Sequence, residues 1–234
     1  MFQLSPSLSA GSDLNLAETL AATRALKHIH LDIDDGNFVH EITFGADTAR
    51  TVCTSTNVPV DVHLEVLNPL DYVEPLARAG VAAVCAHVEA LAFPSEFLSA
   101  ARKAGIPKVG LACNLKTPID ELLSYANQVD YFLFVSVEAD SDGLPFRPMT
   151  LWKVRRVYEA LRSEELQKYA GACENIELWV DGGVNEQNLP DVVAAGADGA
   201  VVGRAVFGAE DPIAAAERIC ALGESCRIAN TKEA

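Results

Sequence analysis

The sequence predicts a (β/α)8 barrel, and three observations support that prediction. Eight apolar, strand-like runs alternate with helix-like stretches from one end of the chain to the other. No linker, low-complexity tract or charge block interrupts the alternation, so residues 1–234 are expected to form a single domain. Polar side chains gather at the carboxyl ends of the predicted strands, the face that carries the active site in barrel enzymes. An open doubly wound sheet is the alternative, but the first strand leads into Ser7–Gly11 rather than a G-x-G-x-x-G loop.

The predicted elements follow one another in strict alternation. In chain order the strands are Phe2–Ser7, His28–Ile33, Val58–Leu64, Val81–Val88, Lys108–Cys113, Tyr131–Val137, Ile176–Asp181 and Gly199–Gly203. The helices are Asp13–Arg24, Ala46–Ser55, Pro69–Ala79, Ser95–Lys103, Pro118–Asn127, Thr150–Tyr169, Glu186–Ala195 and Asp211–Leu222. Eight such units of strand and helix favour a closed parallel barrel.

The second predicted strand carries polar side chains on one face. Leu31 and Ile33 alternate with polar residues, so His30, Asp32 and Asp34 project from the same side. The third strand repeats the pattern, with polar positions at Asp61, His63 and Glu65. Parallel strands are usually apolar on both faces, and a buried unpaired polar group costs several kcal/mol, so these side chains need a partner. A metal ion, a sugar or a proton in transit would serve.

A metal site is the first chemistry that these residues suggest. Two imidazoles and two carboxylates from three strands form the candidate ligand set: His30, Asp32, His63 and Asp181. Zn²⁺, Mn²⁺, Fe²⁺ and Co²⁺ accept such a mixed set, whereas Mg²⁺ and Ca²⁺ prefer oxygen ligands alone. The competing interpretation is that each histidine is simply hydrogen-bonded by a neighbouring carboxylate.

Asp32 and Asp181 also form a candidate acid–base pair. They come from strands far apart in the barrel order, so they can approach a ligand from opposite sides. A metal between them would polarise a carbonyl and stabilise an enediolate, and proton return on the opposite face would invert the adjacent carbon without an organic cofactor. In the competing interpretation Asp181 only caps the turn at Gly182 and Gly183.

A phosphate site is the third candidate. Gly182 and Gly183 follow the seventh strand, and Gly203 and Arg204 follow the eighth. The loops after these two strands bind phosphate in many barrels, because glycine permits close backbone approach and arginine can add a charged contact.

Composition excludes several other classes of function. The formal net charge is -15, so nucleic acid and anionic membrane surfaces are improbable partners. We expect a cytoplasmic protein, because the sequence has no long apolar span, no signal-peptide pattern at its start and no disulfide or metal-finger spacing among its six cysteines.

Along nearly its whole length the chain resembles the ribulose-phosphate 3-epimerase family. The matching pieces are Ser5–Ser9, His30–Val39, Asp61–Leu64, His87–Glu89, Asn114 with Thr117–Pro118, Ser136–Val137, Asp181–Val184 and Gly203 with Phe207. The resemblance implies a barrel enzyme, favouring a homo-oligomer, that interconverts D-ribulose 5-phosphate and D-xylulose 5-phosphate or a related ketose phosphate at C3. It implies one divalent metal held by His30, Asp32, His63 and Asp181, acid–base roles for Asp32 and Asp181, Ser9 near the substrate, and phosphate contacts at Gly182, Gly183 and Gly203.

The chain departs from the family at positions that read the substrate. Asp34, Glu65 and Val135 replace methionines that line the reacting end of the pocket, and Arg204 replaces a serine. The glycine-rich lid is replaced by residues 138–146, which include two aspartates. Together with Asn114 and Ser136, the three replaced methionine positions are the candidate specificity residues. The added carboxylates could accept hydrogen bonds from sugar hydroxyls or raise the pKa of the catalytic aspartates.

Other functions on the same scaffold are alternatives. A Schiff-base aldolase needs a lysine inside the top of the barrel, but Lys27 and Lys108 are predicted at the opposite end and Lys116 lies in a loop. A metal-dependent hydrolase is conceivable, because bound water could be activated. A non-catalytic sugar-phosphate-binding barrel is the third alternative, motivated by the acidic lid.

Overall fold

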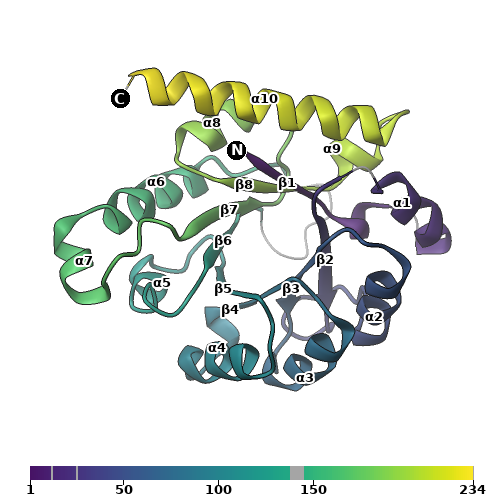
Figure 1. The fold of residues 1–234 in the computed structure, drawn as a ribbon, viewed down its shortest axis with the longest axis horizontal. Coiled ribbons are helices and arrows are strands. Elements are labelled where there is room, and N and C mark those ends of the chain that lie inside the picture. The colour runs from purple at the N-terminus through teal and green to yellow at the C-terminus, as the bar shows by residue number, and fades with distance from the viewer. Residues whose placement is uncertain (12, 25, 138–144, 234) are drawn as a thin grey trace.

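The chain folds into a (β/α)8 barrel, as predicted (Figure 1). The computed structural model describes residues 1–11, 13–24, 26–137 and 145–233. Eight strands form one sheet in the order β1-β8-β7-β6-β5-β4-β3-β2, and every pairing is parallel. An isolated parallel bridge between Ser7 and His30 joins the two ends of this sheet and closes it.

The strands are short and the helices lie outside them. The strands are β1 (Gln3–Pro6), β2 (Ile29–Asp34), β3 (Val60–Glu65), β4 (Ala83–His87), β5 (Lys108–Cys113), β6 (Tyr131–Val135), β7 (Glu177–Asp181) and β8 (Gly199–Val202). The helices are α1 (Leu16–Ala22), α2 (Ala46–Ser55), α3 (Leu70–Ala79), α4 (Pro94–Lys103), α5 (Asp120–Leu123), α6 (Met149–Leu161), α7 (Glu164–Ala170), α8 (Leu189–Ala194), α9 (Arg204–Phe207) and α10 (Pro212–Glu233). Among the described helices, none is both long and apolar enough to cross a bilayer.

The alternation of β2 and β3 separates the apolar core from the polar interior. Leu31 and Leu64 are fully buried within the main apolar cluster, which also includes residues of the surrounding helices. The opposite faces of the two strands meet in register, with His30 beside Asp61, Asp32 beside His63 and Asp34 beside Glu65. Pairing in this register gathers the polar side chains of two strands on one wall of the barrel.

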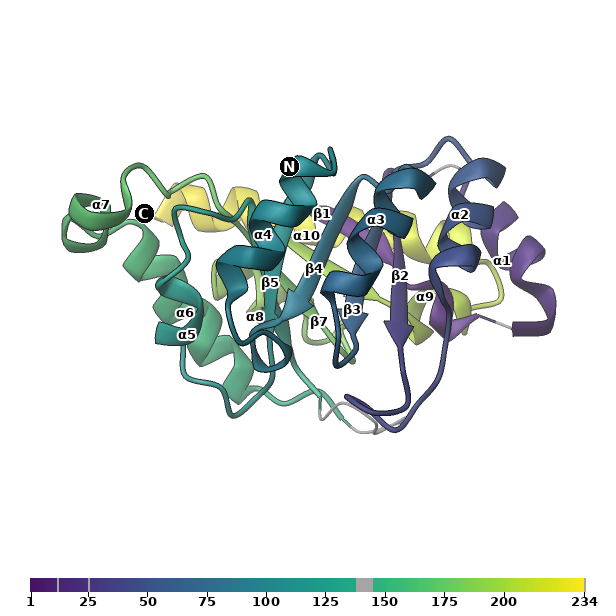
Figure 2. The ribbon, with the colours of Figure 1, turned by 90° about the horizontal axis from the view of Figure 1, so that it is seen from below.

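A second, smaller apolar cluster fills the lower part of the barrel. Its members are Ala83, Cys85, Ala112, Tyr131, Leu133, Trp179 and Val201. Below the polar residues these side chains make the barrel a packed core rather than a pore. Figure 2 shows β2, β3 and β4 running in the same direction, with their carboxyl ends at one end of the barrel. Lys108 begins β5 at the other end, where its Nζ lies 2.7 Å from Glu177 Oε1.

Several predicted boundaries were wrong, mostly in the last third of the chain. The predicted helix Thr150–Tyr169 is two helices, because Ser163 has extended backbone and its hydroxyl accepts a hydrogen bond from the Leu166 N–H. The predicted helices Pro118–Asn127 and Glu186–Ala195 are shortened to α5 and α8. The predicted helix Asp211–Leu222 extends to Glu233 as α10, and α9 was not predicted.

Candidate functional site

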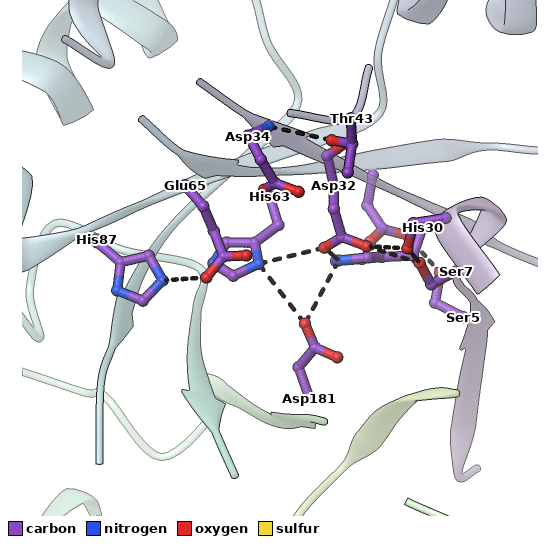
Figure 3. Close-up of polar contacts among 12 residues, drawn as sticks. Ser5, Ser7, His30, Asp32, Asp34, Thr43, His63, Glu65, His87 and Asp181 are labelled. Atoms are coloured by element: carbon purple, nitrogen blue, oxygen red, sulfur yellow. Dashed lines mark hydrogen bonds and ion pairs between the residues drawn. The ribbon is translucent and has the colours of Figure 1, made fainter. Parts of the chain in front are cut away.

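The four predicted metal ligands come together inside the barrel from β2, β3 and β7, with Asp181 at the carboxyl end of β7 (Figure 3). Their ligand atoms all lie within 4.8 Å of one another. His30 Nε2 lies 3.0 Å from Asp32 Oδ1 and 3.8 Å from Asp181 Oδ2. His63 Nδ1 lies 3.4 Å and 3.6 Å from the same two oxygens. Both histidine rings are buried. The set offers two imidazoles and two carboxylates, which is a donor set typical of a divalent transition-metal site.

The hydrogen bonds around His30 fit such an ion. Asp61 contacts His30 Nδ1, and Ser5 Oγ donates to the other oxygen of Asp61 at 2.6 Å. A carboxylate accepts hydrogen bonds only, so Nδ1 carries a hydrogen toward Asp61. Nε2 lies 3.0 Å from Asp32 Oδ1, where it donates a hydrogen bond if the ring is protonated and offers its lone pair to a metal if the ring is neutral. A carboxylate behind a histidine is the usual support of a metal-binding imidazole. Neither nitrogen of the buried His63 has a hydrogen-bond partner, which leaves its lone pair available to a metal.

The electrostatics of the cluster call for a positive charge. Burial lowers the pKa of His30, but the carboxylates of Asp32 and Asp61 outweigh it and hold the pKa well above its usual value. Burial likewise opposes ionisation of Asp32, yet the two histidines hold the pKa of Asp32 well below its usual value. The carboxylates therefore favour a cationic partner between them, supplied either by protons on the imidazoles or by a metal.

Two serines after β1 hold the second oxygen of Asp32. Ser7 Oγ and Ser9 Oγ donate to Asp32 Oδ2 at 2.6 Å and 2.9 Å. These bonds leave Oδ1 facing the histidines, so the orientation of the Asp32 carboxylate is fixed from both sides. Ser9 also lines the cavity described next, as expected for a residue near the substrate.

A cavity of about 770 Å³ opens in front of the cluster. Most of the predicted site residues line it: Ser9, Asp32, Asp34, Glu65, Val135, Asp181, Gly182, Gly183, Gly203 and Arg204. Arg204 is the only cationic residue among the described residues of its wall. No lysine is among the described lining residues.

The glycine positions of the predicted phosphate loops are required by the backbone. Gly182 and Gly183 have φ angles of 103° and 66°, in the left-handed region that favours glycine. A Cβ on Gly182 would lie 2.7 Å from the Val137 side chain, and one on Gly203 would lie 2.7 Å from Ala10 Cβ. The chain at Gly182 therefore lies close to Val137, and the chain at Gly203 lies close to Ala10, on this side of the cavity.

Two candidate specificity residues have structural contacts instead of a place in the cavity wall. Ser136 is fully buried, and its Oγ donates to the Asp181 carbonyl oxygen at 2.6 Å, which positions the end of β7. Asn114 donates its backbone N–H to Glu89 Oε1 at 2.8 Å and accepts a hydrogen bond from Lys153 Nζ at 2.7 Å. Of the altered lid, Pro145 and Phe146 line the cavity, and residues 138–144 lie outside the described residues.

The two added carboxylates lie side by side in the cavity wall. Asp34 is 6% exposed and its Oδ1 has no hydrogen-bond partner. Burial, with the neighbouring charges of Glu65 and Asp32, raises the pKa of Asp34 to about 8. Burial opposes ionisation of Glu65 too, but His63 and His87 more than offset it and lower the pKa of Glu65. This end of the cavity thus carries two neighbouring carboxyl groups whose pKa values are shifted in opposite directions.

Sequence reasoning missed the residues that orient the histidines. Asp61 was seen on the inward face of its strand but was given no role, and Glu89 was treated only as part of a motif. His87 Nδ1 lies 3.0 Å from Glu89 Oε2, in the same relation as His30 to Asp61. The available signal for Glu89 was its position two residues after His87, in the 3-10 turn Val88–Ala90 that follows β4.

Comparisons with known proteins agree with this geometry. Residues 3–207 match the family model described as the ribulose-phosphate 3 epimerase family. A ribulose-phosphate 3-epimerase of Mycobacterium tuberculosis H37Rv is 34% identical, over 91% of this chain and 89% of its own length. The cytoplasmic isoform of ribulose-phosphate 3-epimerase from Oryza sativa subsp. japonica is 33% identical, over 98% and 96%. The Schizosaccharomyces pombe ribulose-phosphate 3-epimerase is 35% identical, over 90% and 89%.

Solved structures with low sequence identity share the fold. A structure of KGPDC from Streptococcus mutans superposes with a TM-score of 0.71 at 15% identity, covering 95% of this chain and 97% of that one. Orotidine 5'-phosphate decarboxylase from Pyrococcus horikoshii OT3 superposes with a TM-score of 0.66 at 16% identity, covering 95% and 99%. These similarities support the barrel fold.

Proposed function

The chain belongs to the ribulose-phosphate 3-epimerase family, and we propose that it inverts C3 of a ketose phosphate with Asp32 and Asp181 as its proton-transfer groups. The family membership makes it an enzyme of the epimerase type. The observation that carries the mechanism is that Asp32 of β2 and Asp181 of β7 line one cavity and face the same pair of buried histidines. The substrate is D-ribulose 5-phosphate, D-xylulose 5-phosphate or a related ketose phosphate.

One divalent ion fits between these side chains. His30, Asp32, His63 and Asp181 would hold Zn²⁺, Mn²⁺, Fe²⁺ or Co²⁺, in keeping with the donor set and with the hydrogen bond that Asp61 makes to His30. When bound, such an ion acts as a Lewis acid that polarises the carbonyl next to the reacting carbon.

The two aspartates exchange the C3 proton from opposite sides. In one direction the Asp32 carboxylate removes the proton while Asp181 returns one to the other face, and in the reverse direction the roles are exchanged. Ser7 and Ser9 hold Asp32 Oδ2, which keeps that carboxylate oriented in either protonation state. Ser136 fixes the backbone at Asp181 through the carbonyl oxygen of that residue.

The phosphate group is bound on the β7 and β8 side of the cavity. Gly182, Gly183 and Gly203 let the backbone approach the ligand, and Arg204 adds the only cationic side chain among the described lining residues. The substrate then lies with its phosphate near Arg204 and its sugar chain directed toward the cluster.

Specificity is set at the reacting end of the cavity. Asp34 and Glu65 give this wall two carboxyl groups. Val135 has a smaller side chain than the methionine that is usual in the family at this position. These carboxylates are suited to accept hydrogen bonds from substrate hydroxyl groups, so the preferred ketose phosphate is expected to carry a donor there. Ser136 and Asn114 contribute through the backbone they position. We further propose a single-domain, cytoplasmic homo-oligomer, which light scattering and cell fractionation test.

The proposal is tested by proton exchange. Purified protein is loaded with Zn²⁺, Mn²⁺, Fe²⁺ or Co²⁺ and incubated in D₂O with tetrulose, pentulose and hexulose phosphates, while NMR follows deuterium at C3. At least one substrate should gain deuterium and convert to its C3 epimer, and the matching unphosphorylated ketose should react far more slowly. Thermal stabilisation by a sugar phosphate without any exchange, across the whole panel and all four metals, would instead favour the non-catalytic binding alternative.

A further inference from the structure

A second group of candidate ligands lies next to the first and includes a residue that is unusual for the family. His63, Glu65 and His87 offer ligand atoms that all lie within 4.8 Å of one another. Glu65 ends β3 and lines the cavity, and His87 ends β4 and is fully buried. The ring of His87 stacks on that of His63, with centroids 4.9 Å apart and an interplanar angle of 28°.

The hydrogen-bond network fixes which nitrogen of His87 is available. Glu89 accepts hydrogen bonds from the Asn114 N–H at 2.8 Å and from the Thr117 hydroxyl, and its Oε2 lies 3.0 Å from His87 Nδ1. With two donors already directed at it, Glu89 is a pure acceptor, so the hydrogen of the His87 ring lies on Nδ1. The His87 Nε2 lone pair then points the other way.

That lone pair has no hydrogen-bond partner and faces another acceptor. His87 Nε2 is buried and has no hydrogen-bond partner, and Glu65 Oε1 lies at an ion-pair distance of 3.5 Å from it. A lone pair opposite a carboxylate oxygen in a buried place is unfavourable unless a cation or a proton lies between them. The arrangement resembles that of the first site, where Asp61 contacts His30 Nδ1 and the opposite nitrogen, Nε2, faces carboxylates.

Around this group the described cavity wall offers carboxyl groups rather than a cationic side chain. Asp34 pairs in register with Glu65 on the adjoining strand, and its buried Oδ1 also has no partner. The cationic residue of the described cavity wall, Arg204, follows β8, whereas Asp34 and Glu65 belong to β2 and β3.

We propose that Glu65 and His87, with the buried ring of His63 beside them, bind a second divalent transition-metal ion adjacent to the first. Two imidazoles and one carboxylate suit Mn²⁺, Fe²⁺, Co²⁺ or Zn²⁺. The methionine usual in the family at position 65 offers only a soft thioether, which is a poor ligand for these ions. The site is therefore a property of this chain, and it does not depend on which sugar phosphate the protein converts.

Metal stoichiometry tests the proposal with two substitutions of the same kind. Glu65→Met removes the ligand, and Val135→Met restores another family methionine in the same cavity wall without touching the ligand set. After equilibrium dialysis against Mn²⁺, elemental analysis should give two ions per chain for the unaltered protein and for Val135→Met, and one for Glu65→Met. EPR spectra of the first two proteins should show magnetic interaction between neighbouring Mn²⁺ ions, which Glu65→Met lacks.

Other results would overturn it. One ion per unaltered chain means that His87 and Glu65 share a proton instead of a metal. Two ions in Glu65→Met place the second ion elsewhere, and none in Glu65→Met means that the two sites are not separate. Epimerase activity is recorded on the same samples, so a protein with two ions and no turnover retains the second site while the proposed function fails.

Discussion

Asp61 holds the Nδ1 side of His30, so that the opposite nitrogen of the ring faces Asp32 Oδ1 at 3.0 Å and Asp181 Oδ2 at 3.8 Å. The bond crosses from β2 to β3 between residues that are paired in register. It fixes both the tautomer and the orientation of the imidazole, and it is secured in turn by Ser5.

Replacing Asp61 should therefore weaken metal binding without removing a ligand. In Asp61→Asn the affinity for Zn²⁺ or Co²⁺ is expected to fall by about 10- to 100-fold, the range for loss of a carboxylate that supports a metal-binding histidine. Competition with a chromophoric chelator measures the change. Ser5→Ala, which removes only the outer hydrogen bond, should have a smaller effect, and an unchanged affinity in Asp61→Asn would show that the bond does not orient the ring.

If Asp32 and Asp181 are the two proton-transfer groups, each single variant should exchange the C3 proton of only one epimer. Asp181→Asn should still exchange the C3 proton of one epimer with D₂O but not invert it, and Asp32→Asn should do the same only for the other epimer. Loss of one acid–base group should lower kcat by about 10²- to 10⁴-fold. Metal content is measured in both variants, because each aspartate also belongs to the ligand set. Exchange from the same epimer in both variants would contradict the two-sided mechanism.

Asp34 predicts a dependence of stability on pH in protein stripped of metal. Burial beside Glu65 and Asp32 raises the pKa of Asp34 to about 8, above the value near 3.8 of an unperturbed carboxyl. A raised carboxyl pKa favours the folded state at low pH, and that contribution is lost as the pH rises toward about 8. At pH 9, Asp34→Asn should therefore exceed the unaltered protein in free energy of unfolding by about 1–3 kcal/mol.

Urea unfolding at pH 5, 7 and 9 measures the change for Asp34. The advantage of the Asn variant should grow across that series, since the unaltered protein ionises Asp34 while the variant cannot. A constant difference at all three pH values would mean that the carboxyl does not titrate in this range.

Glu89 predicts the opposite pH dependence. Burial opposes its ionisation, but hydrogen bonds from His87, Thr117 and Asn114 more than compensate and lower the pKa of Glu89 to about 2. A depressed carboxyl pKa stabilises the folded state above about 4.5, and the contribution is lost as the pH falls toward about 2.

At pH 7, Glu89→Gln should reduce the free energy of unfolding by about 2–3 kcal/mol. The difference should narrow as the pH is lowered below 4.5, where the unfolded carboxyl becomes protonated. Denaturant unfolding at pH 7 and pH 3.5 measures both values. Glu159→Gln, on the exposed face of α6, is the matched control and should change stability by less than about 0.5 kcal/mol.

The sequence predicted the architecture well because the relevant signals are local. The alternation of Leu31 and Ile33 with polar residues identified both the strand β2 and its inward face. The strand bounds follow the apolar runs to within a few residues. Helix ends were less predictable, since the break between α6 and α7 depends on the backbone and hydroxyl of Ser163, a residue whose type is also compatible with a helix interior.

The sequence predicted which residues belong to the candidate site, but not which of them contact one another or line the cavity. His30, Asp32, His63 and Asp181 were named from strand ends, and the structure brings their ligand atoms together. Their roles in catalysis and metal binding stay predictions. Ser136 and Asn114 were expected near the substrate, yet neither lines the cavity among the described residues, because which side chain reaches a ligand depends on the exact direction of each strand end.

By itself the sequence determined that this chain is a (β/α)8 barrel of the ribulose-phosphate 3-epimerase family with imidazoles and carboxylates at the carboxyl ends of its strands. It also marked Asp34 and Glu65 as departures from the family. Only the tertiary structure decided that Asp34 and Glu65 lie opposite each other in the pairing of β2 with β3. It also decided that Glu89 contacts Nδ1 of His87, so that Nε2 of this ring faces Glu65, and that Asp61 contacts Nδ1 of His30. Strand alternation follows from local backbone geometry, whereas register, tautomer and unpaired atoms depend on segments that meet only when the barrel closes.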